Sequence, residues 1–135
     1  QSIMLKYEPK ILLAFGEAIR DNRKIFDWLL KNGYPELAAL ASAIKGSEDA
    51  GTWLMKNKFP HLAALDAAID GSEKAYEWLQ RYNYSFLIVF ADACQGKPKA
   101  IGWLKKNDLE IFIRLAVIIK HLRDNKTFDY HKLHF

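Results

Sequence analysis

The chain lacks several features on which common classes of protein depend. Its 135 residues include a single cysteine, which excludes an internal disulfide framework and a zinc site built from cysteines. No uninterrupted apolar run reaches about 18 residues, so we expect no transmembrane helix. The longest apolar stretch, residues 111–122, is interrupted by Arg114, Lys120 and His121. The first residue is not methionine and no signal-peptide pattern follows it, which leaves both a processed and a cut N-terminus open.

Signature motifs of catalysis and cofactor binding are also missing. There is no P-loop, no dinucleotide-binding glycine pattern, no Gly-x-Ser-x-Gly and no His-Glu-x-x-His. Half of the residues are hydrophobic, 27% are charged and the net charge is +4, which is typical of a globular domain rather than a disordered chain. We therefore expect one globular domain (1–135) that is not an enzyme, holds no cofactor or metal, and resides in the cytoplasm.

What the sequence does contain is an internal repeat of 25 residues. The only tryptophans are evenly spaced at this period and each is followed by leucine: Trp28, Trp53, Trp78 and Trp103. Three columns of apolar residues share the period: Leu12, Leu37, Leu62, Leu87 and Phe112; Phe15, Leu40, Leu65, Phe90 and Leu115; and Ile19, Ile44, Ile69, Cys94 and Ile119. The period divides the chain into a leader, four repeats and a degenerate C-terminal repeat that caps the array: 1–9, 10–34, 35–59, 60–84, 85–109 and 110–135.

Each repeat is predicted to form two short helices. In the third repeat, Leu62, Leu65 and Ile69 recur at helical spacing. Glycine can end the first helix in the left-handed conformation, serine can cap the second, and asparagine can close it. These signals recur through the chain: Gly46, Gly71 and Gly96; Ser47 and Ser72; and Asn32, Asn57, Asn83 and Asn107.

Helices of about ten residues are marginal alone in water, so the repeats must stack to bury their apolar faces. We expect an all-α solenoid of five two-helix repeats with the four tryptophans in equivalent buried positions. One aromatic residue marks each junction between repeats, where it can fix the start of the next helix: Tyr34, Phe59 and Tyr84. The leader and the fifth repeat are expected to cover the two ends of the stack.

The second half of each repeat resembles an ankyrin repeat. Gly71 and the pair Trp78-Leu79 have the spacing of the ankyrin glycine and its paired leucines, and residues 60–64 are similar to the Pro-Leu-His-x-Ala opening. The first helix is about one turn longer, and 25 residues leave no room for the β-hairpin of a unit of about 33 residues. The resemblance covers only the helix pairs of 10–109, and it implies a binding scaffold without hairpin tips.

The function that this architecture favours is protein or peptide binding in a groove lined by the first helices. The partner is an unidentified protein or peptide, and the candidate binding residues are polar positions on those helices, with His61 expected to be exposed: Glu17, Glu36, His61, Asp66 and Asp92. Carboxylates that share a groove can also perform acid–base chemistry, which makes an enzyme with scattered carboxylates a third hypothesis. Ala41 and Ser42 interrupt that row in the second repeat.

A second hypothesis is contact with nucleic acid or phosphate through a basic ridge, formed by Lys31, Lys56, Arg81 and Lys106, which recur at the repeat period. A simpler interpretation is that each cation stabilises the C-terminal end of its helix. Acidic residues outnumber basic ones in the third repeat, which would interrupt a continuous positive track. We therefore expect no nucleic-acid partner.

Overall fold

The chain folds into helices throughout the part that the structure describes. The computed structural model describes the backbone of residues 3–133 and the side chains of residues 4–125. Within this part there are no strands, so the predicted all-α class is confirmed. The elements are η1 (Ile3–Lys6), α1 (Pro9–Ile19), α2 (Arg23–Lys31), α3 (Pro35–Ile44), α4 (Glu48–Lys56), α5 (Pro60–Ile69), α6 (Glu73–Arg81), α7 (Ser85–Cys94), α8 (Pro98–Lys106) and α9 (Glu110–Leu133).

The first eight helices form four hairpins at the 25-residue period. The predicted glycine is present at the turn of the second, third and fourth hairpins, whereas Asp21 takes the left-handed conformation in the first. Gly46, Gly71 and Gly96 have φ of 110°, 91° and 81°, the left-handed region that glycine adopts without steric cost. The hydroxyls of Ser47 and Ser72 each accept a hydrogen bond from the backbone three residues later, at 3.1 and 3.2 Å. Local capping chemistry therefore sets the hairpin boundaries.

The left-handed residue after the second helix of each hairpin lies one position later than we predicted in three of the four cases. The left-handed residues there are Gly33, Lys58, Asn83 and Asp108. Three asparagines act differently, because their side-chain amides donate to the backbone carbonyl of the preceding tryptophan. Each of these bonds is 2.8 Å long: Asn32 to Trp28, Asn57 to Trp53, and Asn107 to Trp103. The backbone N–H of each asparagine donates to the same carbonyl, so asparagine closes the helix with its side chain and its backbone together, without adopting the left-handed conformation.

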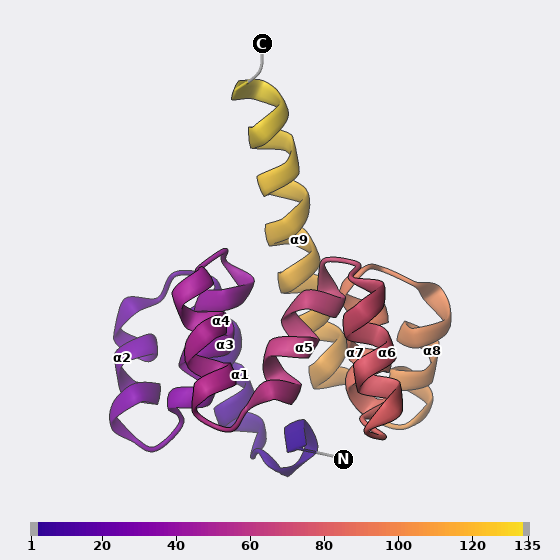
Figure 1. Ribbon diagram of the computed structural model, residues 1–135, viewed down its shortest axis with the longest axis horizontal. Coiled ribbons are helices and arrows are strands. Elements are labelled where there is room, and N and C mark those ends of the chain that lie inside the picture. The colour runs from indigo at the N-terminus through magenta and orange to yellow at the C-terminus, as the bar shows by residue number, and fades with distance from the viewer. Residues whose placement is uncertain (1–2, 134–135) are drawn as a thin grey trace.

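The odd-numbered helices form a closed ring. Each of α1, α3, α5 and α7 contacts the next odd-numbered helix, and α9 contacts both α7 and α1. Each even-numbered helix packs against the two odd-numbered helices that flank it in sequence, on the outside of the ring (Figure 1). The molecule therefore differs from the open stack with two capped ends that we expected, because α9 joins the last hairpin to the first. The leader places Met4 and Tyr7 in the core.

Glycine at position 16 permits the contact that closes the ring. A β-carbon added there would lie 3.0 Å from Leu115 Cδ2 and 3.3 Å from Ile118 Cδ1, both on α9. These distances are at or below the tight end of ordinary side-chain contacts. The absence of a side chain on α1 thus lets α9 pack closely against it.

The fifth repeat is one continuous helix instead of the predicted helix pair. At the turn positions of the other repeats it has His121 and Leu122, so it lacks both the glycine that ends the first helix and a side-chain oxygen that caps the second. The helix therefore continues for 24 residues, about 36 Å. Its C-terminal part projects beyond the ring (Figure 1). No helix in the described part of the chain has the length and hydropathy of a membrane-spanning segment.

The three apolar columns found in the sequence form the core. All fifteen residues are at most 6% exposed, and they belong to one continuous hydrophobic cluster. Cys94 takes the place of isoleucine in its column and is completely buried. Burial raises the pKa of the Cys94 thiol above its usual range, so it remains protonated and acts as a small apolar side chain.

The tryptophans, in contrast, are not fully buried as we predicted, because Trp53 and Trp78 are half-buried against the core and the other two are exposed. Trp28 and Trp103 are 41% and 44% exposed, whereas the leucine that follows each tryptophan is completely buried: Leu29, Leu54, Leu79 and Leu104. Three of the tryptophans instead stack on the junction aromatics, with centroid distances of 5.7–6.2 Å and interplanar angles of 6–13°: Trp28 on Tyr34, Trp53 on Phe59, and Trp78 on Tyr84. These three tryptophans therefore cover the junctions between hairpins, whereas Trp103 lies 6.4 Å from Phe86.

Candidate functional site

The five residues that we predicted to form a binding site lie in different environments: Glu17, Glu36, His61, Asp66 and Asp92. Glu36 and His61 are each only 8% exposed, on α3 and α5. Asp66 and Asp92 are half-buried on α5 and α7, whereas Glu17 is exposed on α1. Glu36 accepts a hydrogen bond from the Tyr7 hydroxyl at 2.5 Å, which ties it to the leader. The structure does not gather these side chains on one accessible surface.

His61 is buried rather than exposed, because its column in the repeat is a core position. Its ring stacks on Tyr84 at a centroid distance of 5.2 Å and lies 6.0 Å from Phe59. Nε2 is buried without a hydrogen-bond partner. Burial lowers the pKa of His61 below its ordinary value of 6.5, and the positive charges of the N-terminus and Lys6 lower it further.

The buried His61 predicts a loss of stability in mild acid. Below about pH 6.5 the unfolded chain takes up a proton at this residue that the folded chain does not. The free energy of unfolding therefore falls by up to about 1.4 kcal/mol for each unit by which the pH is lowered. The loss continues until the pH reaches the lowered pKa of the folded state. Urea titrations between pH 7.5 and 5 should show this fall. His61→Phe, which copies Phe86 from the same column, should be less sensitive to pH in this range, and an unchanged dependence would contradict the assignment.

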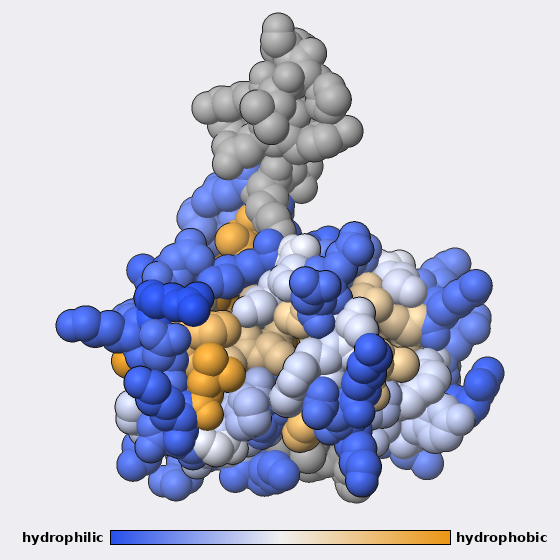
Figure 2. Space-filling model, turned by 60° about the vertical axis from the view of Figure 1, so that its left-hand side comes forward, coloured by the Kyte–Doolittle hydropathy of each residue, from blue (hydrophilic) through white to orange (hydrophobic). Residues whose placement is uncertain are grey.

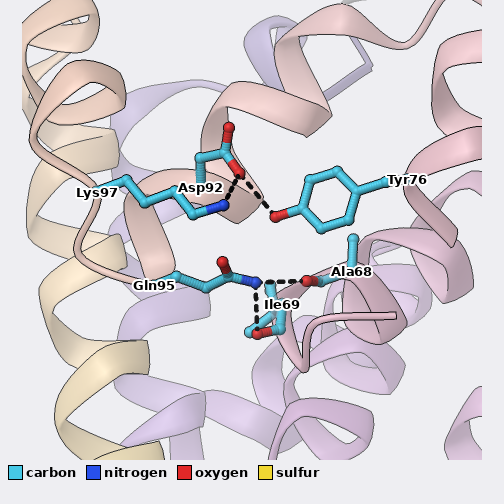
Figure 3. Close-up of polar contacts among 6 residues, drawn as sticks. All are labelled: Ala68, Ile69, Tyr76, Asp92, Gln95 and Lys97. Atoms are coloured by element: carbon cyan, nitrogen blue, oxygen red, sulfur yellow. Dashed lines mark hydrogen bonds and ion pairs between the residues drawn. The ribbon is translucent and has the colours of Figure 1, made fainter. Parts of the chain in front are cut away.

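Asp92 holds two hairpins together. Tyr76 of α6 donates to Asp92 Oδ1 at 2.8 Å, and Lys97 Nζ lies 3.1 Å from the same oxygen (Figure 3). Beside them, the Gln95 amide donates to the carbonyl of Ala68 at 2.8 Å, near the end of α5. Burial and the bond to Asp92 raise the pKa of Tyr76 above its usual range, so its hydroxyl stays a donor. These contacts give Asp92 a structural role between α6 and α7.

An accessible apolar groove lies between two outer helices, α4 and α6, with α5 as its floor. Its volume is about 320 Å³. The α4–α6 groove, as we call it, is lined by Met55, Pro60, Ala63, Ala64, Ala67, Ser72, Lys74, Ala75 and Trp78. Met55 is 60% exposed, although it is a large apolar residue. In the view that brings the side with α2 and α4 forward, hydrophobic surface lies in hollows bordered by hydrophilic side chains (Figure 2).

Two departures from the repeat pattern lie beside this groove: Gly51, one helical turn before the lining residue Met55, and the small residues of the floor. Position 51 on α4 is glycine, and a β-carbon there would have no atom within 4 Å. The equivalent positions of the other hairpins carry half-buried side chains that pack against the core: Phe26, Tyr76 and Ile101. The floor is also made of small residues, because Ala63, Ala64 and Ala67 correspond to Ile88, Val89 and Asp92 in the next repeat. A missing side chain and a low floor thus combine at one place.

The two ends of the groove differ in charge. Glu48, Asp49 and Glu73 lie in the first turns of α4 and α6, whereas Lys56 and Arg81 lie in their last turns. The two helices run in the same direction, because they occupy the same position in successive repeats. One end of the groove is therefore acidic on balance, although Lys74 of the lining lies next to Glu73, and the other end is basic, which can orient a charged partner.

Sequence reasoning missed this groove because it looked for polar residues. The signal was nevertheless present: among the four hairpins, Gly51 is the one small residue in a column that otherwise holds phenylalanine, tyrosine and isoleucine. A second cavity, of about 350 Å³, lies where α9 leaves α1. Its lining combines apolar and polar side chains: Ile19, Arg20, Asp21, Val117, Ile118, His121, Leu122 and Asn125.

The four residues of the basic ridge are exposed in the last turns of α2, α4, α6 and α8. A cation at a helix C-terminus is worth about 0.3–1 kcal/mol. We expect the quadruple change of the ridge to glutamine to lower stability only modestly. Wild type should bind short duplex and single-stranded nucleic acid no more tightly than about 10⁻⁴ M at physiological salt. A salt-sensitive micromolar complex that the quadruple variant loses would instead support phosphate binding.

Neither a metal centre nor a known relative defines the site. Among the described residues, no group of three or more histidine, cysteine, aspartate or glutamate side chains is arranged to hold a metal ion. The α4–α6 groove is therefore the candidate site on geometric grounds. Comparisons with protein family models, with curated proteins and with solved structures give no match to this chain.

Proposed function

We propose that the protein is a non-enzymatic helical-repeat scaffold that binds a peptide segment of a partner in the α4–α6 groove. The observation that carries the proposal is the local difference between repeats: this groove is open and apolar where Phe26 and Tyr76 occupy the equivalent positions elsewhere. A concave apolar surface with a few polar groups on its rim is the usual form of a binding site. The floor of the groove is α5, the first helix of its repeat, whereas its walls, α4 and α6, are the second helices of theirs.

The apolar surface that the groove can bury limits the affinity that we expect for a peptide. Full burial of one large apolar side chain is worth about 1.5–3 kcal/mol, which alone would give binding weaker than millimolar. Contacts with Met55 and Trp78, and with the charged ends of the groove, must supply the remainder. We therefore expect a linear peptide to bind with a dissociation constant in the micromolar to millimolar range.

A random peptide library displayed on phage, selected on the folded protein, tests the proposal. The binding position of each enriched peptide is then mapped by amide and indole chemical shifts. We expect the largest shifts at the amides of Ala63, Ala64 and Ala67 and at the Trp78 indole. The residues around the α1–α9 cavity serve as the internal control. Selection without enrichment, or shifts confined to that cavity, would contradict the proposal.

A further inference from the structure

The other repeats indicate what kind of side chain fits the α4–α6 groove. At the position equivalent to Gly51, the chain itself supplies a large side chain in each of the other three hairpins, and all three pack against the core: Phe26, Tyr76 and Ile101. In those hairpins the outer helix thus places a large side chain of its own against the core at this position. In the second hairpin no described residue of the chain does so.

Tyr76 shows where such a side chain goes. Its ring crosses from α6 to α7, where the hydroxyl meets Asp92 (Figure 3). The residue one repeat before Asp92 is Ala67, which lines the α4–α6 groove. A side chain that started at position 51 and followed the same path would therefore end inside the groove. Gly51 also lies one helical turn before Met55, on the same face of α4.

The lining selects an apolar occupant without a polar end. Where the Tyr76 hydroxyl finds a carboxylate, the α4–α6 groove offers the methyl group of Ala67. Of the two polar residues in the lining, the Ser72 hydroxyl already accepts the backbone N–H of Ala75 as a helix cap, and Lys74 is exposed. Met55 and Trp78 provide a thioether and an indole, both of which favour contact with an aromatic ring. Phenylalanine therefore fits this environment better than tyrosine does.

We propose that the bound peptide, on which the proposed function rests, inserts one phenylalanine side chain into the α4–α6 groove in place of the side chain that Gly51 lacks. A basic residue of the peptide faces Glu48 and Glu73 at one end of the groove. An acidic residue faces Arg81 at the other. The partner is thus a peptide with a central phenylalanine between residues of opposite charge, and the contact repeats one that the chain makes within its own hairpins.

The decisive variant is Gly51→Phe, which would fill the groove from within. The glycine is helical and its β-position is open, so the substitution should not disturb the fold. Removing a glycine from a helix and burying an aromatic ring should raise the melting temperature by a few degrees. We expect the same variant to weaken binding of a groove-mapped peptide by about tenfold or more. Loss of binding together with a gain of stability cannot arise from misfolding.

Two matched controls separate pocket filling from other effects. Gly51→Ala makes the same gain in helix propensity but leaves the groove open, so it should keep the peptide affinity. Gly102→Phe places the same ring at a glycine of α8 that is exposed and has no neighbour within 4 Å of its β-position. This variant should also bind as wild type does.

The peptide side of the contact supplies an independent measurement. Replacing the central phenylalanine of a groove-mapped peptide by alanine should abolish binding in fluorescence anisotropy, and replacing it by tyrosine should weaken it. One contrary result is that peptides bind in the groove but lose no affinity when phenylalanine is removed, and another is that they bind Gly51→Phe as tightly as wild type. Either result would contradict the inserted phenylalanine and leave the proposed scaffold function in place. If no peptide binds in the groove, both proposals are overturned.

Discussion

Replacing Leu79 by alanine is expected to lower the free energy of unfolding by about 2–5 kcal/mol, the usual cost of truncating a buried leucine. Replacing Trp103, a member of the neighbouring tryptophan column, by alanine should cost clearly less, although tryptophan is the larger residue. Leu79 is completely buried, whereas Trp103 is 44% exposed and has Leu109 where the other hairpins have a stacking aromatic. Urea denaturation followed by far-ultraviolet circular dichroism measures both changes.

Trp28→Ala provides the control for the tryptophan column. Trp28 is exposed to a similar degree, at 41%, and it stacks on Tyr34 at 6.2 Å. Trp103 has an aromatic pair of its own, with Phe86 at 6.4 Å and an interplanar angle of 53°. The losses at Trp28 and Trp103 should therefore be similar, and each should stay below the loss at Leu79. If Trp103→Ala costs as much as Leu79→Ala, the tryptophans contribute to the core as the sequence first suggested.

Ile119→Ala is expected to destabilise the protein as much as Ile69→Ala, by about 2–5 kcal/mol in each case. Both residues are buried, at 0% and 1% exposure, and they occupy the same column of the repeat. In an open stack the terminal unit has one neighbour, so a truncation there costs less than in the middle. In the closed ring α9 has two neighbours, and equal losses are expected. Denaturant titration of the two variants decides between these arrangements.

Substitutions at two glycines, Gly16 and Gly102, test the closure of the ring without removing any atom from the core. Gly16→Ile adds a side chain where α1 and α9 touch, and crowding of this kind typically costs about 1–3 kcal/mol. Gly102→Ile adds the same side chain at an exposed helical site with open space around it. A large loss for Gly16 and none for Gly102 is the expected result. Equal effects, or a separate early transition of α9 in Ile119→Ala, would contradict a closed ring.

The helices were predictable because their signals are local. Proline or serine at a helix start and glycine after it act within one turn, so the repeat of Gly46, Gly71 and Gly96 was enough to place the hairpins. The continuous α9 was predictable in principle from the same signals, since His121 and Leu122 occupy the turn positions. What misled the prediction was the assumption that a degenerate repeat keeps the shape of the intact ones.

Ring closure was not predictable from the repeat, because it depends on the sum of the rotations between successive hairpins. A small rotation accumulates from hairpin to hairpin, and the same residue pattern is compatible with an open or a closed array. The exposure of the tryptophans had a similar cause. Trp78 and Leu79 are adjacent on a helix, so only one of them can face the inner helices squarely, and hydrophobicity alone does not say which.

The burial of some site residues could be predicted from their column in the repeat, but not from their residue type. Glu36 and His61 share a column with Ile11 and Phe86, which indicates burial, yet their polarity suggested a surface. The groove was visible only as the absence of a bulky residue at Gly51. A groove that results from a missing side chain is found by comparing the repeats with one another.

The closed ring also fixes the number of repeats. An open array can gain or lose a hairpin by tandem duplication or deletion, because each unit needs only its two neighbours. Here α9 must meet α1, so a sixth inner helix would widen the circle and leave a space that the columns of Phe15, Leu40 and their equivalents are too short to fill. A deletion would crowd the same side chains into a smaller circle. Variation in this architecture is therefore confined to substitutions within a constant number of repeats, such as the loss of a large side chain at Gly51.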